Sequence, residues 1–171
     1  MKLSDSEVFA AATLSGKSAL LNAIATYYSR SLVDLIEDNK CHAFHLAVLG
    51  GHLTIVKYFA ENNQELLVEA IADSKFEHLN VAFKNNDRPM LECLITIAKN
   101  NPALMQYAPQ YPVEVIKLLE KLVPEKIQIM VNTFLDMPLK DIDFEVLLHL
   151  MDLATEEMTL KLADNPISLV I

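Results

Sequence analysis

Apolar residues recur at helical spacing along nearly the whole chain, and this pattern predicts an all-helical protein. In the segment 42–59, apolar residues follow one another at three- and four-residue intervals on two successive helices. No run of alternating apolar and polar residues is bounded by turn residues, so we expect essentially no sheet. Start and stop signals predict helices at about 4–14, 18–28, 31–37, 43–49, 53–61, 65–73, 77–85, 88–99, 113–122, 125–136, 142–153 and 156–164.

Specific residues predict where some of these helices begin and end. Ser4 and Glu7 have the spacing of a capping box, in which the serine hydroxyl accepts the Glu7 amide hydrogen and the glutamate reaches back. Gly51 follows the helix at 43–49, and a glycine there adopts the left-handed conformation that ends a helix, so that the chain reverses at Leu53. Ala47 is small enough to allow a neighbouring helix to approach closely. A loop-rich stretch is indicated by Pro102, Pro109 and Pro112.

The segment His42–Phe59 resembles the helix-turn-helix of one ankyrin repeat. The family pattern runs T-P-L-H-L-A-A, two variable residues, G-H, two more variable residues and V-V-K-L-L. The matching residues are His45, Leu46, Ala47, Gly51, His52, Val56 and Lys57, with Phe44 and Ile55 as apolar replacements. The resemblance implies stacked helix-turn-helix repeats, an ankyrin-like α-solenoid in which each hairpin covers its neighbour's apolar face. It also implies that His45 hydrogen-bonds backbone between adjacent repeats.

Weaker matches to the same pattern occur elsewhere and extend the resemblance over roughly residues 17–120. Ala82 follows Ala47 by 35 positions, close to the ankyrin period of ~33 residues, whereas Ala23 precedes Ala47 by 24. Because the chain has only three glycines, we expect shortened hairpin loops. The segments that match are 18–23 with 32–36, 79–82 with 90–95, and 107–108 with 113–119. We therefore expect a repeat stack with an N-terminal capping helix over 1–122, and helical repeats or capping helices packed on that stack over 123–171.

Charge and composition exclude several classes of function. The net charge of −9, from 23 acids against 14 bases, disfavours nucleic-acid binding, which depends on basic residues that neutralise phosphates. Acidic residues dominate after residue 136, and a partner with a basic surface would be steered toward them. The N-terminus is unlike a signal peptide, and no apolar run approaches the ~18 residues of a membrane span. Two cysteines fit a reducing compartment, so we expect a cytoplasmic monomer without membrane contact.

Three groups of residues are candidate sites of chemistry. Residues 11–18 resemble a phosphate-binding loop, but Ala11 replaces its first glycine and a helix, rather than a strand, is predicted before it. Cys41 and His45 share one helical face, yet a structural zinc site needs four ligands, and the other candidates are scattered. A thiol hydrolase would use Cys41 or Cys93 and needs a cysteine with a lowered pKa beside a histidine. Cys93 lies within a helix among leucines and is expected to be buried, and Cys41 is the better candidate only because it precedes a helix. We therefore predict no enzymatic activity, no cofactor and no metal.

The sequence thus predicts a scaffold that binds a partner protein, of unidentified nature, on the concave face of the repeats. In ankyrin domains that face is lined by the inner helices and the turns before them. The matching positions are Ala25, Thr26, Leu49, Gly50, Lys84 and Asn85 on the helices, and Asn39, Lys40, Ser74 and Lys75 at the turns. Two alternatives remain open. In the first, the chain is an accessory domain of a larger protein, of the kind that intracellular bacteria deliver into a host cell's cytosol. In the second, its C-terminal helices form a separate bundle that makes a homo-oligomer.

Overall fold

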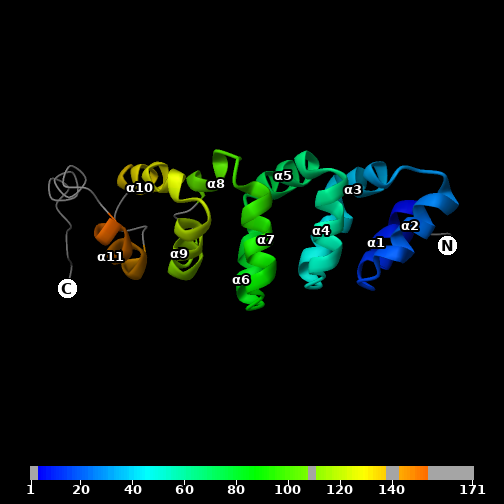
Figure 1. Ribbon diagram of the computed structural model, residues 1–171, viewed down its shortest axis with the longest axis horizontal. Coiled ribbons are helices and arrows are strands. Elements are labelled where there is room, and N and C mark those ends of the chain that lie inside the picture. Colours follow the sequence, from blue (N-terminus) through cyan, green and yellow to red (C-terminus); the bar gives the residue numbers. More distant parts are fainter. Residues whose placement is uncertain (1–3, 108–110, 138–142, 154–171) are drawn as a thin grey trace. The chain divides into compact units, whose positions relative to one another are not determined.

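The computed structural model describes residues 4–107, 111–137 and 143–153, and all regular structure in these ranges is helical (Figure 1). The prediction of an all-α protein is therefore confirmed for the described part of the chain. Two compact units divide at Asn101 and Pro102, and we refer to them as unit 1 and unit 2. The sequence placed a boundary later, after residue 122. The helix predicted at 156–164 lies outside the described residues.

Unit 1 contains seven helices in its described residues, and most lie where the apolar pattern predicts them. Ser4 forms the expected capping box with Glu7, whose backbone N–H donates to the Ser4 hydroxyl at 3.2 Å. The helices predicted at 31–37 and 43–49 belong to one element, α3, which carries a left-handed residue at Cys41 with φ 60°. The bounds are α1 (Asp5–Thr13), α2 (Ser18–Tyr28), α3 (Leu32–Leu49), α4 (Leu53–Asn62), α5 (Gln64–Asp73), α6 (Glu77–Lys84) and α7 (Arg88–Ala98).

Three turns join these helices into antiparallel hairpins and recur at intervals of 35 residues. Gly16, Gly51 and Asn86 each adopt a left-handed backbone, with φ of 69°, 67° and 53°. At the second turn the amide of His52 donates to the carbonyl of Ala47 at 2.9 Å, and at the third the Asp87 amide makes the equivalent bond at 2.9 Å. These are the bonds of a Schellman motif, which satisfies the last carbonyl groups of a helix. The left-handed conformation predicted for Gly51 is confirmed.

The hairpins of unit 1 pack in series (Figure 1). The first helices form one row, in which α1 packs on α3 and α3 on α6, while α2 packs on α4 and α4 on α7 in a second row. Phe9, Phe44 and Phe59 are fully buried between them, and the rings of Phe9 and Phe59 stack with centroids 6.0 Å apart. Each hairpin thus covers apolar side chains of the next.

The first hairpin differs from the one expected at 18–23 with 32–36. The structure pairs α1 with α2 across the turn at Gly16, so the alanine equivalent to Ala47 is Ala12, which precedes it by 35 positions. The predicted capping helix is therefore the first helix of a hairpin. The sequence motif misplaced the hairpin because alanine and leucine are common in both helices of every unit.

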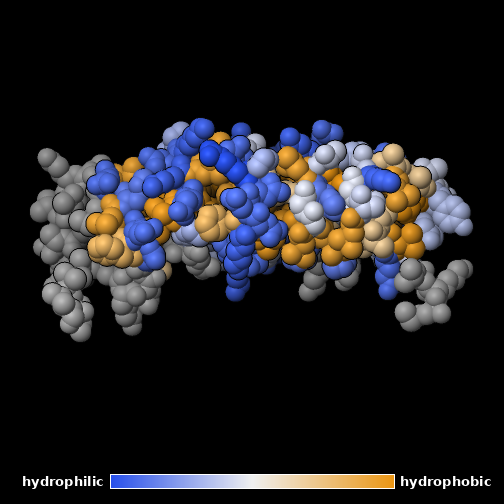
Figure 2. Space-filling model, turned by 90° about the horizontal axis from the view of Figure 1, so that it is seen from below, coloured by the Kyte–Doolittle hydropathy of each residue, from blue (hydrophilic) through white to orange (hydrophobic). Residues whose placement is uncertain are grey.

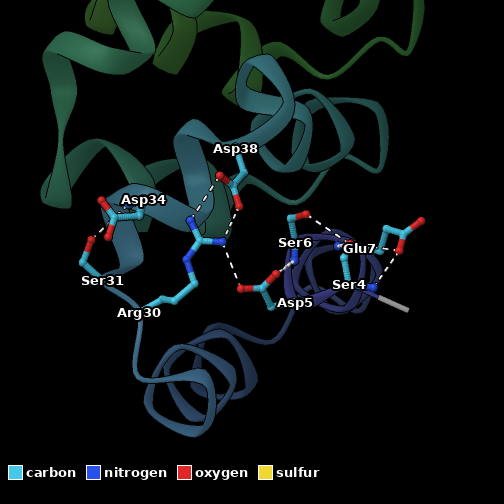
Figure 3. Close-up of polar contacts among 8 residues, drawn as sticks. All are labelled: Ser4, Asp5, Ser6, Glu7, Arg30, Ser31, Asp34 and Asp38. Atoms are coloured by element: carbon cyan, nitrogen blue, oxygen red, sulfur yellow. Dashed lines mark hydrogen bonds and ion pairs between the residues drawn. The ribbon is translucent and has the colours of Figure 1, made fainter. Parts of the chain in front are cut away.

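Arg30 ties the beginning of α1 to α3 (Figure 3). Its Nη1 atom donates to Asp5 Oδ2 at 3.0 Å and to Asp38 Oδ2 at 2.5 Å, and its Nη2 atom donates to Asp38 Oδ1 at 3.1 Å. The two-point contact with Asp38 matches the planar geometry of a guanidinium facing a carboxylate. Arg30 therefore fixes the part of α3 that precedes Cys41 relative to the first hairpin.

The described part of unit 2 is also helical. The helix predicted at 125–136 is preceded by a single turn of 3₁₀-helix, and a short helix that the sequence did not predict lies between Pro102 and Tyr107. His149 on α11 donates from Nε2 to Glu120 on α9 at 3.1 Å. The bounds are α8 (Ala103–Gln106), α9 (Val113–Leu122), η2 (Pro124–Lys126), α10 (Ile127–Leu135) and α11 (Phe144–Leu153). Within the described residues, no helix has the length and apolar character needed to cross a membrane.

Candidate functional site

A groove of about 690 Å³ opens in unit 1 between α3, α5 and α6, and we call it the α3–α5 groove. Cys41, which lines the groove, has a left-handed backbone, and so does Phe76, with φ 61°, which lies in the chain between the lining residues Ser74 and His78. Phe44 is fully buried and contributes an apolar surface. The complete lining is Glu37, Cys41, His42, Phe44, His45, Leu66, Glu69, Ala70, Asp73, Ser74 and His78.

Two histidines from different helices meet in this groove. His45 on α3 and His78 on α6 approach through Nδ1 and Nε2 at 3.3 Å, and the His78 ring lies 4.9 Å from the Phe44 ring. His78 is only 4% exposed. Burial, together with the neighbouring His45, lowers the pKa of His78 from 6.5 to about 4. His78 is therefore neutral at pH 7.

The hydrogen bonds around His78 determine which atom donates and which accepts in each contact. The Ser74 hydroxyl donates its only hydrogen to the Ile71 carbonyl at 2.7 Å, so it accepts at its 2.8 Å contact with His78 Nδ1. A neutral His78 that donates from Nδ1 has a lone pair at Nε2, which accepts from His45 Nδ1. In a neutral His45 ring the remaining nitrogen, Nε2, is then an acceptor.

Three carboxylates line the α3–α5 groove together with Cys41. Glu37 comes from α3, whereas Glu69 and Asp73 come from α5 at positions four apart. Burial raises the pKa of the Cys41 thiol, and the charges of Glu37, Asp73 and Glu69 raise it further. Cys41 is therefore an inert, protonated thiol at pH 7. A thiol hydrolase needs a cysteine whose pKa is lowered, not raised.

A second groove, of about 450 Å³, lies between α1 and α3, and we call it the α1–α3 groove. Ala10, Ala11 and Leu14 line it from α1, and the exposed side chain of His42 lines both grooves. The two grooves therefore follow one another along the row of first helices.

The predicted partner-binding residues do not gather at either groove. Leu49, Gly50, Lys84 and Asn85 are exposed at the turn ends of α3 and α6, as expected. Figure 2 views unit 1 from this end and shows apolar surface over α1 to α4 and hydrophilic surface over α6 and α7. The position equivalent to Leu49 is Leu14 in the first turn, and both leucines are about half exposed, at 45% and 50%.

The other predicted positions fall in different places. Ala25 is 8% exposed and lies on α2, so its prediction as an exposed inner-helix residue is wrong, because α2 is the second helix of its hairpin and packs on α4. Thr26, also on α2, is exposed. Ser74 lines the α3–α5 groove and Lys75 is exposed beside it. Asn39 and Lys40 belong to α3, and their side chains lie outside the described residues.

The role that the resemblance implies for His45 belongs to a different histidine of the ankyrin-like motif. His52 donates from Nε2 to the carbonyl of Leu14 at 2.8 Å and so bonds the backbone of the preceding turn. His45 contacts the side chain of His78 instead. The bond between hairpins that the resemblance assigned to His45 is therefore made by His52 in this structure.

The three groups of residues that are candidate sites of chemistry lack the geometry they need. A helix, α1, precedes Gly16, and Ser18 begins α2 without capping it. No group of three or more His, Cys, Asp or Glu side chains within residues 4–107, 111–137 and 143–153 is arranged to hold a metal ion. Cys93 is half-buried rather than fully buried, and the pKa of its thiol is raised, chiefly by burial.

Four residues of the groove are not predicted from the sequence as members of one site: Glu37, Glu69, Asp73 and His78. Glu69 and Asp73 are spaced four apart on a predicted helix, and that spacing placed them on one face. Whether that face borders α3 depends on how α5 packs against α3, and the sequence pattern does not contain that information. Comparisons with protein-family models, with curated proteins and with solved structures each found no match.

Proposed function

We propose that this chain is a non-catalytic protein-interaction module, built as an ankyrin-like stack of helical hairpins with shortened loops. The proposal rests on the two grooves that share His42 along the row of first helices. In an ankyrin domain the first helices line the concave, partner-binding face. On this proposal the α1–α3 and α3–α5 grooves together receive a segment of a partner protein.

Three features of unit 1 support an ankyrin-like arrangement. The left-handed turns recur every 35 residues, close to the ~33-residue ankyrin period. The first helices pack on one another in one row and the second helices in another. His52 bonds the turn of the preceding hairpin, so adjacent units are joined by a polar contact as well as by buried apolar side chains.

The features that would support catalysis are weak by comparison. The two cysteines have raised pKa values, and His78, which contacts a serine, is almost fully buried. A nucleophile needs an accessible base with a pKa near the working pH. Binding therefore accounts for the grooves better than chemistry does.

Site-specific photo-crosslinking in cells that express the chain tests this proposal. A photoreactive amino acid replaces the exposed groove residue Ala11 or His42, and in matched controls it replaces the exposed residue Lys57 or Glu61 on α4. We expect one partner protein to be captured from both groove positions and from neither control position. Capture of partners from α4 alone, or of no protein from Ala11 and His42, would remove the proposal.

A further inference from the structure

We propose that the α3–α5 groove receives a basic peptide segment of the partner protein, with a lysine or arginine side chain held among Glu37, Glu69 and Asp73. This inference rests on the proposed function, because it names the chemistry of what the concave face binds. Its evidence is the charge, the hydrogen-bonding capacity and the shape of one groove.

The three carboxylates are not neutralised within the structure. None of them forms an ion pair with a side chain that the structure describes. All three line the same groove as Cys41, so their charges lie in one region of the surface. Among the described residues, the lining of the groove therefore includes three carboxylates and no lysine or arginine.

The fold does not account for two of these carboxylates. Glu69 and Asp73 repel one another across one turn of α5, and such a like-charged pair destabilises a helix. Asp73 is also the last residue of α5, where the negative end of the helix dipole disfavours an acid. A ligand with positive charge would offset both effects.

The polar groups of the groove offer mostly acceptors to a ligand. The Ser74 hydroxyl has used its hydrogen on Ile71, and His45 uses Nδ1 on His78, which leaves an acceptor at Nε2 of a neutral ring. The three carboxylates accept only. Of the remaining lining residues, exposed His42 and the Cys41 thiol keep a hydrogen to donate. Ammonium and guanidinium groups, which only donate, are the complement of such a surface.

The apolar lining fits the rest of a lysine or arginine side chain. Phe44, Leu66 and Ala70 contribute hydrocarbon surface to the same groove as the carboxylates. Long basic side chains bury an aliphatic stem while the charged head stays among polar groups. A volume of about 690 Å³ lies within the range of ordinary ligand sites and is large enough for a peptide side chain with its backbone. The carboxylates and histidines do not form a group that holds a metal ion within the described residues, so a dispersed organic cation fits better.

Binding of defined peptides to the full chain tests the inference. The probe is a short fluorescein-labelled peptide of alternating arginine and leucine, and its control carries glutamate in place of arginine. We expect the arginine peptide to bind with an affinity that falls as salt rises, and the glutamate peptide not to bind. The double variant Glu69→Gln, Asp73→Asn should weaken binding by about tenfold.

A matched variant separates the groove from general surface charge. Glu61→Gln, Glu65→Gln removes the same two charges from exposed positions outside the groove, and its affinity should stay within about twofold of the native value. Histidine NMR signals locate the peptide, since those of His42 and His45 should shift while that of His52 at the turn does not. Equal weakening in both double variants, or equal binding of both peptides, would overturn the inference.

The result is distinguishable from failure of the proposed function. If photo-crosslinking from Ala11 and His42 captures a partner whose contacting segment is acidic or uncharged, the interaction module stands and the basic-segment inference falls. If no partner is captured from those positions, both fall.

Circular dichroism of each double variant checks that the fold is kept. We expect it to be unchanged, because the substituted carboxylates are exposed and their amide replacements have the same shape.

Discussion

Cys41 and Phe76 have the same left-handed backbone conformation, with φ of 60° and 61°, at positions 35 residues apart. Both are buried, at 6% and 0% exposure. A residue with a β-carbon is disfavoured there by roughly 1 kcal/mol, so the surrounding structure must hold both in place. Cys41 lies within α3 and lines the α3–α5 groove, and Phe76 precedes α6 between the lining residues Ser74 and His78.

Lys75, next to Phe76, is a site where glycine should stabilise the protein. Its φ is 51°, its side chain is exposed, and its amide donates to Ala72 at the end of α5. Because glycine has no β-carbon to strain this conformation, Lys75→Gly should raise the free energy of unfolding by roughly 0.5–1 kcal/mol. Urea unfolding followed by circular dichroism measures the change. Lys75→Ala is the control, and an equal gain in that variant would show that charge rather than backbone strain is responsible.

The parts of the fold that the sequence predicted are those with a local chemical signal. The turn at Gly51 was predicted because glycine is the usual residue there, and the capping box at Ser4 because both partners are three residues apart. Cys41 and Asn86 adopt the same left-handed geometry without glycine. Tertiary packing maintains their left-handed conformation, and a short stretch of sequence does not predict such packing. The first hairpin was misplaced for the same reason.

The candidate site was less predictable than the fold. The sequence predicts His42 and His45 only as candidate metal ligands and as residues of the ankyrin-like motif, not as neighbours of α5 and α6. Glu69 and Asp73 became part of a site only through the packing of α5 beside α3. Ala25 was assigned to the wrong helix of its hairpin and is buried. Which residues line a groove therefore depended on contacts between elements far apart in sequence.

Gly16 and His52 should show energetic coupling across the first two turns. A β-carbon at Gly16 would lie 2.9 Å from His52 Nδ1, and φ there is 69°. Gly16→Ala therefore strains the backbone and displaces the ring that bonds Leu14. We expect a loss of roughly 1–3 kcal/mol in unfolding free energy, and a smaller loss when the same substitution is made in His52→Ala. Chemical denaturation of the four proteins of this cycle measures the coupling, and equal losses in both backgrounds would contradict it.

His78 should make the protein less stable at mildly acidic pH. Its pKa is about 4 in the folded protein and 6.5 ordinarily, so the unfolded chain binds a proton first as the pH falls. The contribution of neutral His78 is complete above pH 6.5, declines between 6.5 and about 4, and is constant below, for a total loss of roughly 3 kcal/mol. Unfolding free energies at pH 7 and pH 5 measure most of this decline.

The variant His78→Asn isolates that effect from the titration of other groups. Asparagine does not titrate, so the variant should be less stable than the native protein at pH 7 but should lose less stability on going to pH 5. Comparison of the two slopes removes the contribution of the carboxylates, which both proteins share. An unchanged slope would show that His78 is not the group responsible.

Arg30 should control the acidity of Asp5. The hydrogen bond from Arg30 is the main cause that lowers the pKa of Asp5, and the pKa of Arg30 is itself raised by Asp38 and Asp5. Arg30→Gln should therefore raise the Asp5 pKa toward its ordinary value of 3.8, as measured by NMR titration of the carboxyl carbon. Asp5 stabilises the fold above that pH and loses this effect as the pH falls. Arg88→Gln, which removes an exposed pair with Glu92, should leave the Asp5 pKa unchanged.

Tyr111 in unit 2 is a buried polar residue that phenylalanine should replace without loss. Its side chain is 3% exposed, its hydroxyl has no hydrogen-bond partner among the residues that the structure describes, and burial raises its pKa. A buried hydroxyl without a partner gives up its bonds to water and gains none, which costs about 1–3 kcal/mol. Tyr111→Phe should therefore leave stability unchanged or raise it by up to about 1 kcal/mol in urea unfolding. Tyr107 forms an interaction within the structure, so the control variant Tyr107→Phe should not raise stability. A marked loss of stability in Tyr111→Phe would show that the Tyr111 hydroxyl is hydrogen-bonded in solution.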